Sequence, residues 1–311
     1  MEEKLVIRLS NNLGNQMFMY AAGYAASRKM NRSFYYDKIS SYKSYKNIYK
    51  FSLDRFNLNA NLADAKYIFE GFSGYCKRKF LKKIDFFKFN KNFLLEKKDI
   101  NKITFYDETL FNKKYADTVY MEGYFESEKY FLDYKDEIKK QYIPKKHNNF
   151  LTNEYLSKLK NTESVCLCIR HNRFVEKFNK IDEKDIQKSN KFVSEQIDYI
   201  RSAVSYFKSK LNNPVFYLWS NNIKDLNNKL NTRDIIFINN EHIKDELDRI
   251  HCDFFLMTNC KHFAVIPSAF NWWGCWLSNN KDSIILRPNN NYFTNLDIKN
   301  KDYWPSNWKE I

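Results

Sequence analysis

Residues 5–37, LVIRLSNNLGNQMFMYAAGYAASRKMNRSFYYD, decide the fold of the first part of the chain. The apolar run at 5–9 predicts a strand, and apolar positions 17, 20, 21, 24 and 25 predict a helix over 15–30. A second strand is expected at 33–36. This order is typical of a parallel α/β sheet, and Gly14 stands in the turn where a backbone approaches another group closely.

A second α/β pattern begins at Ser164. The run SVCLCIR at 164–170 predicts a strand, and spaced apolar residues from 192 to 211 predict a long amphipathic helix. The intervening stretch 38–161 is rich in Lys and aromatic residues, and we expect it to be mostly helical. Further strands are expected at 215–219, 235–238, 263–266 and 283–286, with helices near 222–230, 246–259 and 268–278.

These patterns predict an α/β protein of two Rossmann-like domains, each with a parallel sheet, and a cleft between them. The first domain would span 1–155, with helical elaboration, and the second 156–311. In such sheets ligands lie at the carboxyl ends of the strands, so the residues that follow strands are the first candidates for a site.

The composition fits a soluble globular protein. The chain has 311 residues, of which 43% are hydrophobic and 18% aromatic, so a large core is expected. The longest apolar runs fall far below the roughly 20 residues of a membrane helix. The acidic start Met1-Glu2-Glu3 does not resemble a signal peptide, which favours a cytoplasmic protein.

The charge balance suggests an anionic partner. Lys and Arg number 52 against 37 Asp and Glu, which fits nucleic acid, an acidic membrane or a phosphorylated substrate. An AT-rich genome would give the same bias without selection for charge. The six cysteines form no Cys-x-x-Cys pair, so free thiols are expected. His251, Cys252, Cys260 and His262 lie close in sequence, but their spacing matches no zinc pattern.

No common nucleotide or hydrolase motif is present. The chain has no Gly-x-Gly-x-x-Gly run after a strand, no Gly-x-x-x-x-Gly-Lys-Ser/Thr loop and no Gly-x-Ser-x-Gly elbow. The expected strand at 164–170 ends instead in Arg170-His171-Asn172-Arg173. A guanidinium holds phosphate oxygens with two donors, so a diphosphate could lie here. Solvated loop cations are an equally good interpretation of these residues alone.

Several segments, in order, resemble the family 11 glycosyltransferases, the bacterial α-1,2-fucosyltransferases. Residues 12–21, NLGNQMFMYA, resemble the family's GLGNQMFQYA, and 120–125, YMEGYF, resemble its Gly-Tyr-Phe-Gln segment. Residues 253–262 resemble its Leu-Met-Ser-x-Cys-x-His run, and 268–274 its Asn-Ser-Thr-Phe-Ser-Trp-Trp motif, with Pro267 in place of the first Asn. The family's central HIRRGDY is CIRHNRF at 168–174, which keeps the first Arg, Arg170, and places Arg173 where the family has an acid.

The resemblance implies a GT-B-like fold and inverting transfer of fucose from GDP-fucose, with no metal and no cofactor. The acceptor would be a hydroxyl, such as galactose O2, of a surface glycan or its precursor. The first domain would bind the acceptor and the second the nucleotide sugar. Arg170 would be catalytic, stabilising the leaving diphosphate. The donor would contact Asn12, Gly14, Asn15, Gln16, Cys168, His171, Arg173, Ser268, Ala269 and Phe270.

No acid matches a family base, although Asp37 and Glu122 are candidates to take the acceptor's proton. A changed donor sugar, or a weakly active relative, is the alternative within the same fold.

The basic segment 77–83, KRKFLKK, carries the alternative from another functional class. It could bind nucleic acid, but no recognition motif accompanies it. It could also rest on anionic lipid at the inner face of the membrane, which would suit an enzyme that extends a lipid-linked glycan. A solvated helix face is the simplest interpretation. We therefore expect a nucleotide-sugar donor and an oligosaccharide or lipid-linked glycan acceptor, and no nucleic acid.

Overall fold

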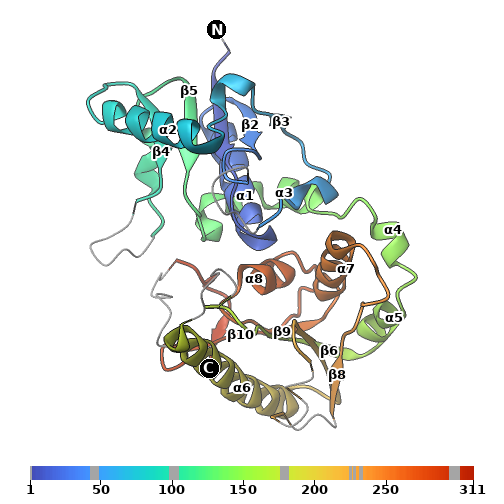
Figure 1. Ribbon diagram of the computed structural model, residues 1–311. Helices are drawn as coiled ribbons and strands as arrows, with labels where there is room; N and C mark the ends of the chain where they lie inside the picture. Colours follow the sequence, from blue (N-terminus) through green and yellow to red (C-terminus); the bar gives the residue numbers. More distant parts are fainter. Residues whose placement is uncertain are drawn as a thin grey trace. The chain divides into compact units, whose positions relative to one another are not determined.

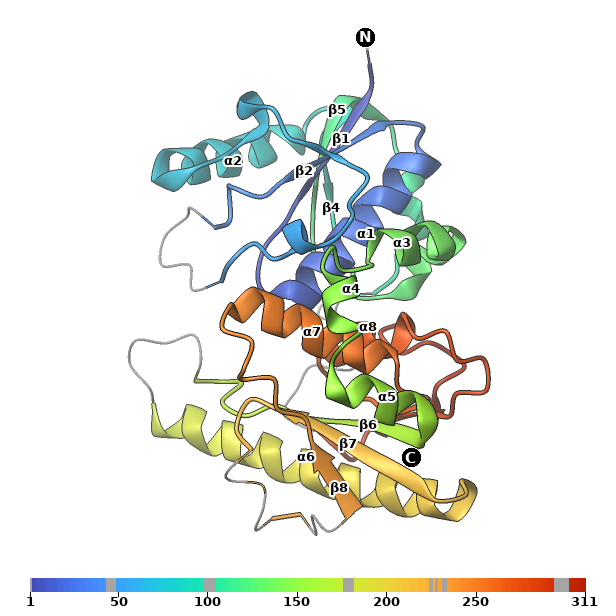
Figure 2. The ribbon, with the colours of Figure 1, turned by 90° about the vertical axis from the view of Figure 1, so that its right-hand side faces the viewer.

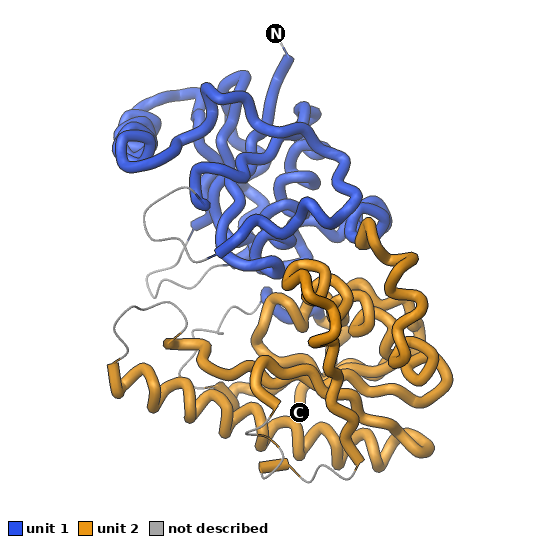
Figure 3. Tube along the Cα trace, turned by 45° about the vertical axis from the view of Figure 1, so that its right-hand side comes forward, with its two compact units in different colours: residues 1–143, 300–305 blue, residues 144–299, 306–311 orange. Residues whose placement is uncertain are grey.

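The computed structural model describes residues 2–42, 49–97, 105–175, 182–223, 226, 229–230, 234–293 and 302–311. The chain divides into two compact units, coloured separately in Figure 3. Unit 1 comprises residues 1–143 and 300–305, and unit 2 comprises residues 144–299 and 306–311. The sequence pattern placed the division after residue 155, whereas the two units divide after residue 143. Residues near the C-terminus contribute to both units.

Unit 1 is built on a five-stranded parallel sheet. Its strands, in the order β3-β2-β1-β5-β4, are Asn61–Leu62, Ser33–Asp37, Lys4–Arg8, Tyr115–Glu122 and Lys91–Leu95. Its helices α1, α2 and α3 are Leu13–Lys29, Gly71–Asp85 and Lys135–Gln141. The strand-helix-strand unit expected over 5–37 is confirmed as β1, α1 and β2 (Figure 1).

Alternate side chains of β1 serve the two faces of the sheet. Ile7 faces α1, where Gly23 comes so close that a Cβ there would lie 2.8 Å from the Ile7 Cβ. Val6 faces the other way, into a cluster with Phe93 and Tyr120, against which Leu81 of α2 packs. The central strand is therefore buried on both sides, which explains its continuous apolar sequence.

The composition of the stretch 38–161 predicted a mostly helical segment, and this prediction is wrong. The stretch supplies three strands of unit 1, β3, β4 and β5, besides α2 and α3. Strand β4 begins with the polar pair Lys91-Asn92 at the edge of the sheet, and none of the first four residues of β5 is buried. Such strands lack the long apolar run that marked β1, so their pattern was obscured.

Unit 2 is built on a six-stranded parallel sheet. Its strands, in the order β11-β10-β9-β6-β7-β8, are Lys309–Glu310, Ile285–Arg287, His262–Ala264, Glu163–Ile169, Pro214–Ser220 and Ile235–Phe237. Its helices α4 to α8 are His147–Phe150, Glu154–Asn161, Glu183–Lys210, Glu246–Thr258 and Ala269–Trp276. Helix α6 covers one face of this sheet, and α7 and α8 cover the other (Figure 2).

The expected elements of the second half agree with this sheet, apart from the helix near 222–230, which falls partly outside the described residues. The predicted fold class, two Rossmann-like α/β units with parallel sheets, is confirmed. The predicted cleft concerns the relation between the units and stays a prediction. Among the helices in the described part of the chain, none combines the length and the apolar character needed to cross a membrane.

Candidate functional site

The loop that follows β6 carries the predicted catalytic residue, and its backbone is held from two sides. Gln196 of α6 is fully buried, and its Oε1 accepts from the Arg170 N–H at 2.9 Å while its Nε2 donates to the Arg170 carbonyl at 3.0 Å. Asn221, after β7, accepts from the His171 N–H at 2.8 Å. The backbone that presents Arg170 is therefore fixed by side chains from the helix and the neighbouring strand.

Asn172 makes the turn in this loop. Its φ is 59°, in the left-handed region, at the position where the family 11 motif has glycine. Asn adopts this conformation more readily than other non-glycine residues because its short side chain bonds locally. The turn that the family's glycine allows is therefore kept, even though the sequence around it has changed.

Arg173, which replaces the family's acid, joins two strand ends. Its guanidinium donates to the Pro267 carbonyl at 2.7 Å, and its Cζ lies 5.2 Å from the centre of the Phe192 ring. Pro267 belongs to the loop between β9 and α8. The arginine at position 173 thus ties the loop after β6 to the loop after β9.

The predicted donor residues Ser268, Ala269 and Phe270 lie at the start of α8, and all three are partly exposed. Asn271, buried behind them, accepts from the Ile266 N–H at 2.8 Å and so fixes the bend that begins the helix. Unit 2 therefore brings these residues next to the Arg170 loop, because β6 and β9 are hydrogen-bonded neighbours. The tryptophans that follow, Trp272, Trp273 and Trp276, are core residues.

Cys168 of β6 and Asp253 of α7 interact electrostatically at this edge of the sheet. Cys168 is 6% exposed, and burial raises the pKa of its thiol well above its ordinary value, so the thiol is neutral. Asp253 of α7 is only partly exposed, and burial raises the pKa of its carboxyl from 3.8 to about 6. Asn240, which donates to Asp253 Oδ1 at 2.7 Å, opposes that shift, as do Arg249 and Trp219.

Sequence reasoning did not select Asp253 as a site residue, although its segment carried part of the resemblance. A carboxyl that titrates near neutral pH at the carboxyl end of a parallel sheet is typical of a functional position. The only available signal was its place at the head of the 253–262 segment. The burial that shifts its pKa comes from tertiary packing.

The remaining predicted donor residues lie in unit 1, at the start of α1. Asn12 stands at the N-cap, Gly14 is buried in the first turn, and Asn15 donates to Glu126 Oε1 at 2.9 Å. Gln16 is fully buried, and its Nε2 donates to the carbonyls of Asn11 and Lys50 at 2.7 and 2.9 Å. Its Oε1 accepts from the Ser52 N–H at 2.9 Å. These bonds show that Gln16 holds the chain at Asn11 and at residues 50–52, and its predicted contact with the donor stays a prediction.

The two acids considered as a base are both engaged inside unit 1. Asp37 is fully buried, and its carboxylate accepts from the backbone N–H groups of Ile39 and Ser40, each at 2.9 Å, and from the Tyr120 hydroxyl. Glu122 pairs with Arg78 at 2.7 Å and with Lys82. Both carboxylates therefore hold elements of unit 1 together, and a role as the base stays a prediction for each.

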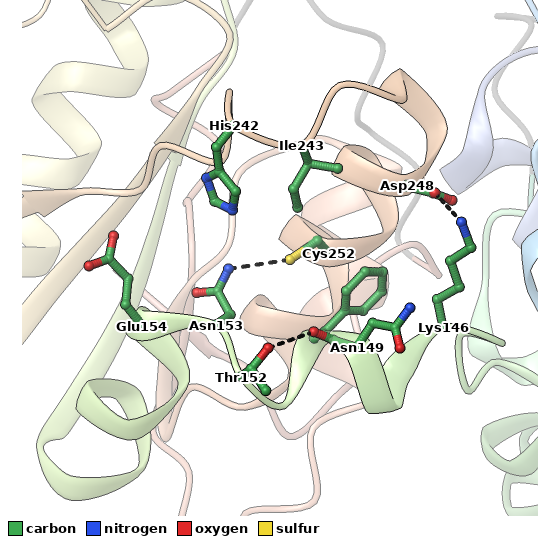
Figure 4. A pocket seen from close by; sticks show the side chains of 10 residues that line it. Lys146, Asn149, Thr152, Asn153, Glu154, His242, Ile243, Asp248 and Cys252 are labelled. Atoms are coloured by element: carbon green, nitrogen blue, oxygen red, sulfur yellow. Dashed lines mark hydrogen bonds and ion pairs between the residues drawn. The ribbon is translucent and has the colours of Figure 1, made fainter.

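Unit 2 also contains a cavity of about 470 Å³ between the segment 146–154 and α7 (Figure 4). None of the predicted site residues lines it. Asn153, on its wall, donates to Asn240 Oδ1 at 2.9 Å, and Asn240 in turn donates to Asp253. A chain of two hydrogen bonds therefore connects this cavity with the carboxyl at the strand edge.

No group of three or more His, Cys, Asp and Glu side chains suited to a metal ion occurs among the described residues. His262, from the segment considered for zinc, has both ring nitrogens engaged. Its Nε2 lies 3.0 Å from Glu163 Oε2, and its Nδ1 accepts from the Ile284 N–H at 3.0 Å.

Comparison with known proteins gives one family and two bacterial relatives. The family described as "Glycosyl transferase family 11" matches residues 75–311. An α-1,2-colitosyltransferase of Escherichia coli is 28% identical over 316 residues, which cover 99% of this chain and 98% of the relative. The O-antigen biosynthesis glycosyltransferase WbnK of Escherichia coli is 29% identical over 93 residues, which cover 30% of each chain.

Two solved structures share the fold at low identity. A mutant of Arabidopsis thaliana FUT1 in complex with GDP has a TM-score of 0.52 and 13% identity, and the match covers 94% of this chain and 72% of that one. NodZ α-1,6-fucosyltransferase from Bradyrhizobium, co-crystallised with GDP, has a TM-score of 0.50 and 11% identity, covering 88% and 92%. These likenesses extend over both units.

Proposed function

Because the chain belongs to glycosyl transferase family 11, we propose that it transfers fucose from GDP-fucose, with inversion, to a hydroxyl of a surface glycan, such as O2 of galactose. The chain is a glycosyltransferase of the fucosyltransferase-like kind with a GT-B-like fold. In the proposed reaction the acceptor oxygen attacks the anomeric carbon and the bond to the diphosphate breaks. The products are GDP, the glycosylated acceptor and the proton of the acceptor hydroxyl, which is released to the solvent.

The observation that carries the proposal is the fixed loop that presents Arg170 beside the start of α8. The leaving diphosphate gains negative charge as its bond breaks, so a cation fixed in advance stabilises the transition state more than the ground state. The side-chain amide of Gln196 makes two hydrogen bonds to the backbone of Arg170. Asn221 accepts a third from the backbone N–H of His171, so the backbone that carries the guanidinium is held at both residues. The backbone that carries Arg170 therefore needs little reorganisation when the side chain meets that charge.

Protein cations, rather than a metal ion, carry the diphosphate charge in this proposal. The sequence has no Asp-x-Asp pair, which would hold a divalent ion beneath a diphosphate. Arg170 on the β6 loop supplies a permanent positive charge, since a guanidinium stays protonated. No cofactor is needed for the transfer.

A second donor, GDP-colitose, is favoured by one finding, the relative named α-1,2-colitosyltransferase that matches 99% of this chain. Colitose is fucose without its 3-hydroxyl. A site that hydrogen-bonds a hydroxyl rejects the analogue that lacks it by a large factor, whereas an apolar pocket discriminates only weakly. The ratio of kcat/KM for the two donors therefore distinguishes these candidates.

The experiment begins with nucleotide binding. GDP, UDP, CMP and ADP are compared by the thermal stabilisation each produces, followed by turnover with the matching sugar nucleotides. A ligand that binds only the folded state stabilises it by about 2.7 kcal/mol at a hundred times its Kd. We expect a clear shift with GDP alone. A preference for UDP or CMP contradicts the proposal.

A further inference from the structure

Helix α2 and the turn after it display aromatic side chains to the solvent. Phe72, Phe80, Phe86, Phe87 and Phe89 are 83%, 63%, 78%, 85% and 78% exposed. Single exposed apolar residues are common, but a set of phenyl rings on one helix and its adjoining turn marks an interaction surface. These five residues, with the exposed lysines among them, are called the outer face of α2 below.

The other side of α2 is anchored, so the helix cannot turn to bury these rings. Arg78 and Lys82 both bind the carboxylate of Glu122, at the end of β5. Leu81 packs against the core cluster that includes Phe93 and Tyr120. The exposed set therefore follows from how α2 is fixed to the sheet, beside the edge strand β4 (Figure 1).

The turn after α2 is held as firmly as the helix. The Asp85 carboxylate accepts from the backbone N–H groups of Asn92 and Phe93 at 2.6 and 3.1 Å. Lys91 Nζ donates to the carbonyls of Asp85 and Phe86 at 3.0 and 2.9 Å. The rings of the turn thus stand on an ordered backbone.

Positive charge surrounds the rings. Residues 71–91 contain one acid, Asp85, whose carboxylate is turned inward onto backbone amides. The exposed cations among these residues are Lys77, Lys79, Lys83 and Lys88. Lys79 Nζ lies 4.8 Å from the centre of the Tyr75 ring, so charge and aromatic surface are interleaved at close range.

We propose that the outer face of α2 binds an anionic membrane surface. The phenyl rings would enter the boundary between headgroups and acyl chains, and the lysines would meet the lipid phosphates. The apolar rings match the acyl-chain boundary of such a membrane, and the cations around them match its phosphates. A long aliphatic stem lets each lysine stay at the phosphate level while the rings insert.

This inference does not depend on the proposed activity, because vesicle binding is measured without donor or acceptor. Flotation with phosphatidylglycerol-containing vesicles is compared with flotation on pure phosphatidylcholine vesicles. We expect binding to the anionic vesicles only, weakening as salt rises. The full chain is used throughout.

Two variants test the face itself. Phe80→Ser with Phe87→Ser removes two exposed rings, and we expect vesicle affinity to fall on the order of tenfold for each ring. Lys79→Glu with Lys83→Glu removes two cations, and a loss of at least roughly fivefold for each is expected. Leu132→Ser with Leu151→Ser is the matched control, since these apolar residues are 45% and 51% exposed elsewhere.

Thermal unfolding of each variant shows whether it folds, and turnover on a water-soluble acceptor should be unchanged in all of them. Equal vesicle binding by the wild type and both variants overturns the proposal, as does wild-type protein that does not bind anionic vesicles. Loss of oligonucleotide binding, or dissociation of a dimer, in the same variants without loss of vesicle binding assigns the face to another partner and also overturns it.

Discussion

Replacing Asp253 with Asn tests whether a buried carboxyl is kept at the strand edge of unit 2 at a cost in stability. Its pKa is raised from 3.8 to about 6 by burial, so the folded state holds the proton more tightly than the unfolded chain. The carboxyl lowers stability progressively as pH rises from about 4 to about 6, and the full effect remains above that. The rise of the pKa from 3.8 to about 6 corresponds to a free energy of about 3 kcal/mol.

The Asn variant cannot ionise, so it escapes this effect. Asn keeps an oxygen that can accept from Asn240, which donates to Asp253 Oδ1 at 2.7 Å in the wild type. We expect the variant to be more stable than the wild type by up to about 3 kcal/mol near neutral pH and equally stable near pH 4. Urea unfolding across this pH range measures the difference.

Glu241→Gln is the matched control, because Glu241 belongs to the same unit, is exposed and lies outside the helices. Its stability should follow that of the wild type across the same range. A stability difference for Asp253→Asn that does not change with pH, or a destabilised variant near neutral pH, refutes the reasoning. A carboxyl kept despite this cost points to function, so turnover should fall while stability rises.

Three further predictions concern the loop, the metal and the core. Arg170→Lys keeps the positive charge but loses the planar guanidinium, so turnover should fall on the order of a hundredfold while the protein still folds. The control is Arg201→Lys, in an exposed ion pair with Asp198, and its turnover should match that of the wild type. Activity should survive excess chelator, and loss that Mn²⁺ or Mg²⁺ restores would contradict a metal-independent transfer. Gly23→Ala should destabilise unit 1 by about 1–3 kcal/mol, because the added Cβ would lie 2.8 Å from Ile7 Cβ and 2.9 Å from Phe34 Cε2. Urea unfolding measures the change, and an unchanged midpoint of the unfolding transition would contradict the prediction.

The elements that the sequence predicted well are those buried on both sides. Strand β1 and strand β6 are continuous apolar runs, and such runs identify central parallel strands without knowledge of the fold. Strand β4 was missed because an edge strand that begins Lys91-Asn92 carries little apolar signal. A short, partly exposed strand is identified by the neighbouring strands with which it pairs, and a single sequence does not show that pairing.

Some features of the candidate site could likewise be predicted from the sequence, and others depend on tertiary contacts. The cationic run after β6 was predictable, since a parallel sheet presents the residues that follow its strands. The inward bond from Arg173 to Pro267 and the internal bonds of Gln16 depend on which backbone carbonyls lie nearby in the fold. The shifted pKa of Asp253 likewise arises from burial by residues distant in sequence.

The transfer itself tests the central claim most directly. The chain is incubated with a galactoside acceptor and either GDP-fucose or GDP-colitose, and the product's linkage and anomeric configuration are determined by NMR. The account predicts acceptor-dependent release of GDP and an inverted glycosidic bond at a galactose hydroxyl, with O2 as the expected position. A product with retained configuration, or transfer from a UDP-sugar in preference to both GDP-sugars, would contradict it.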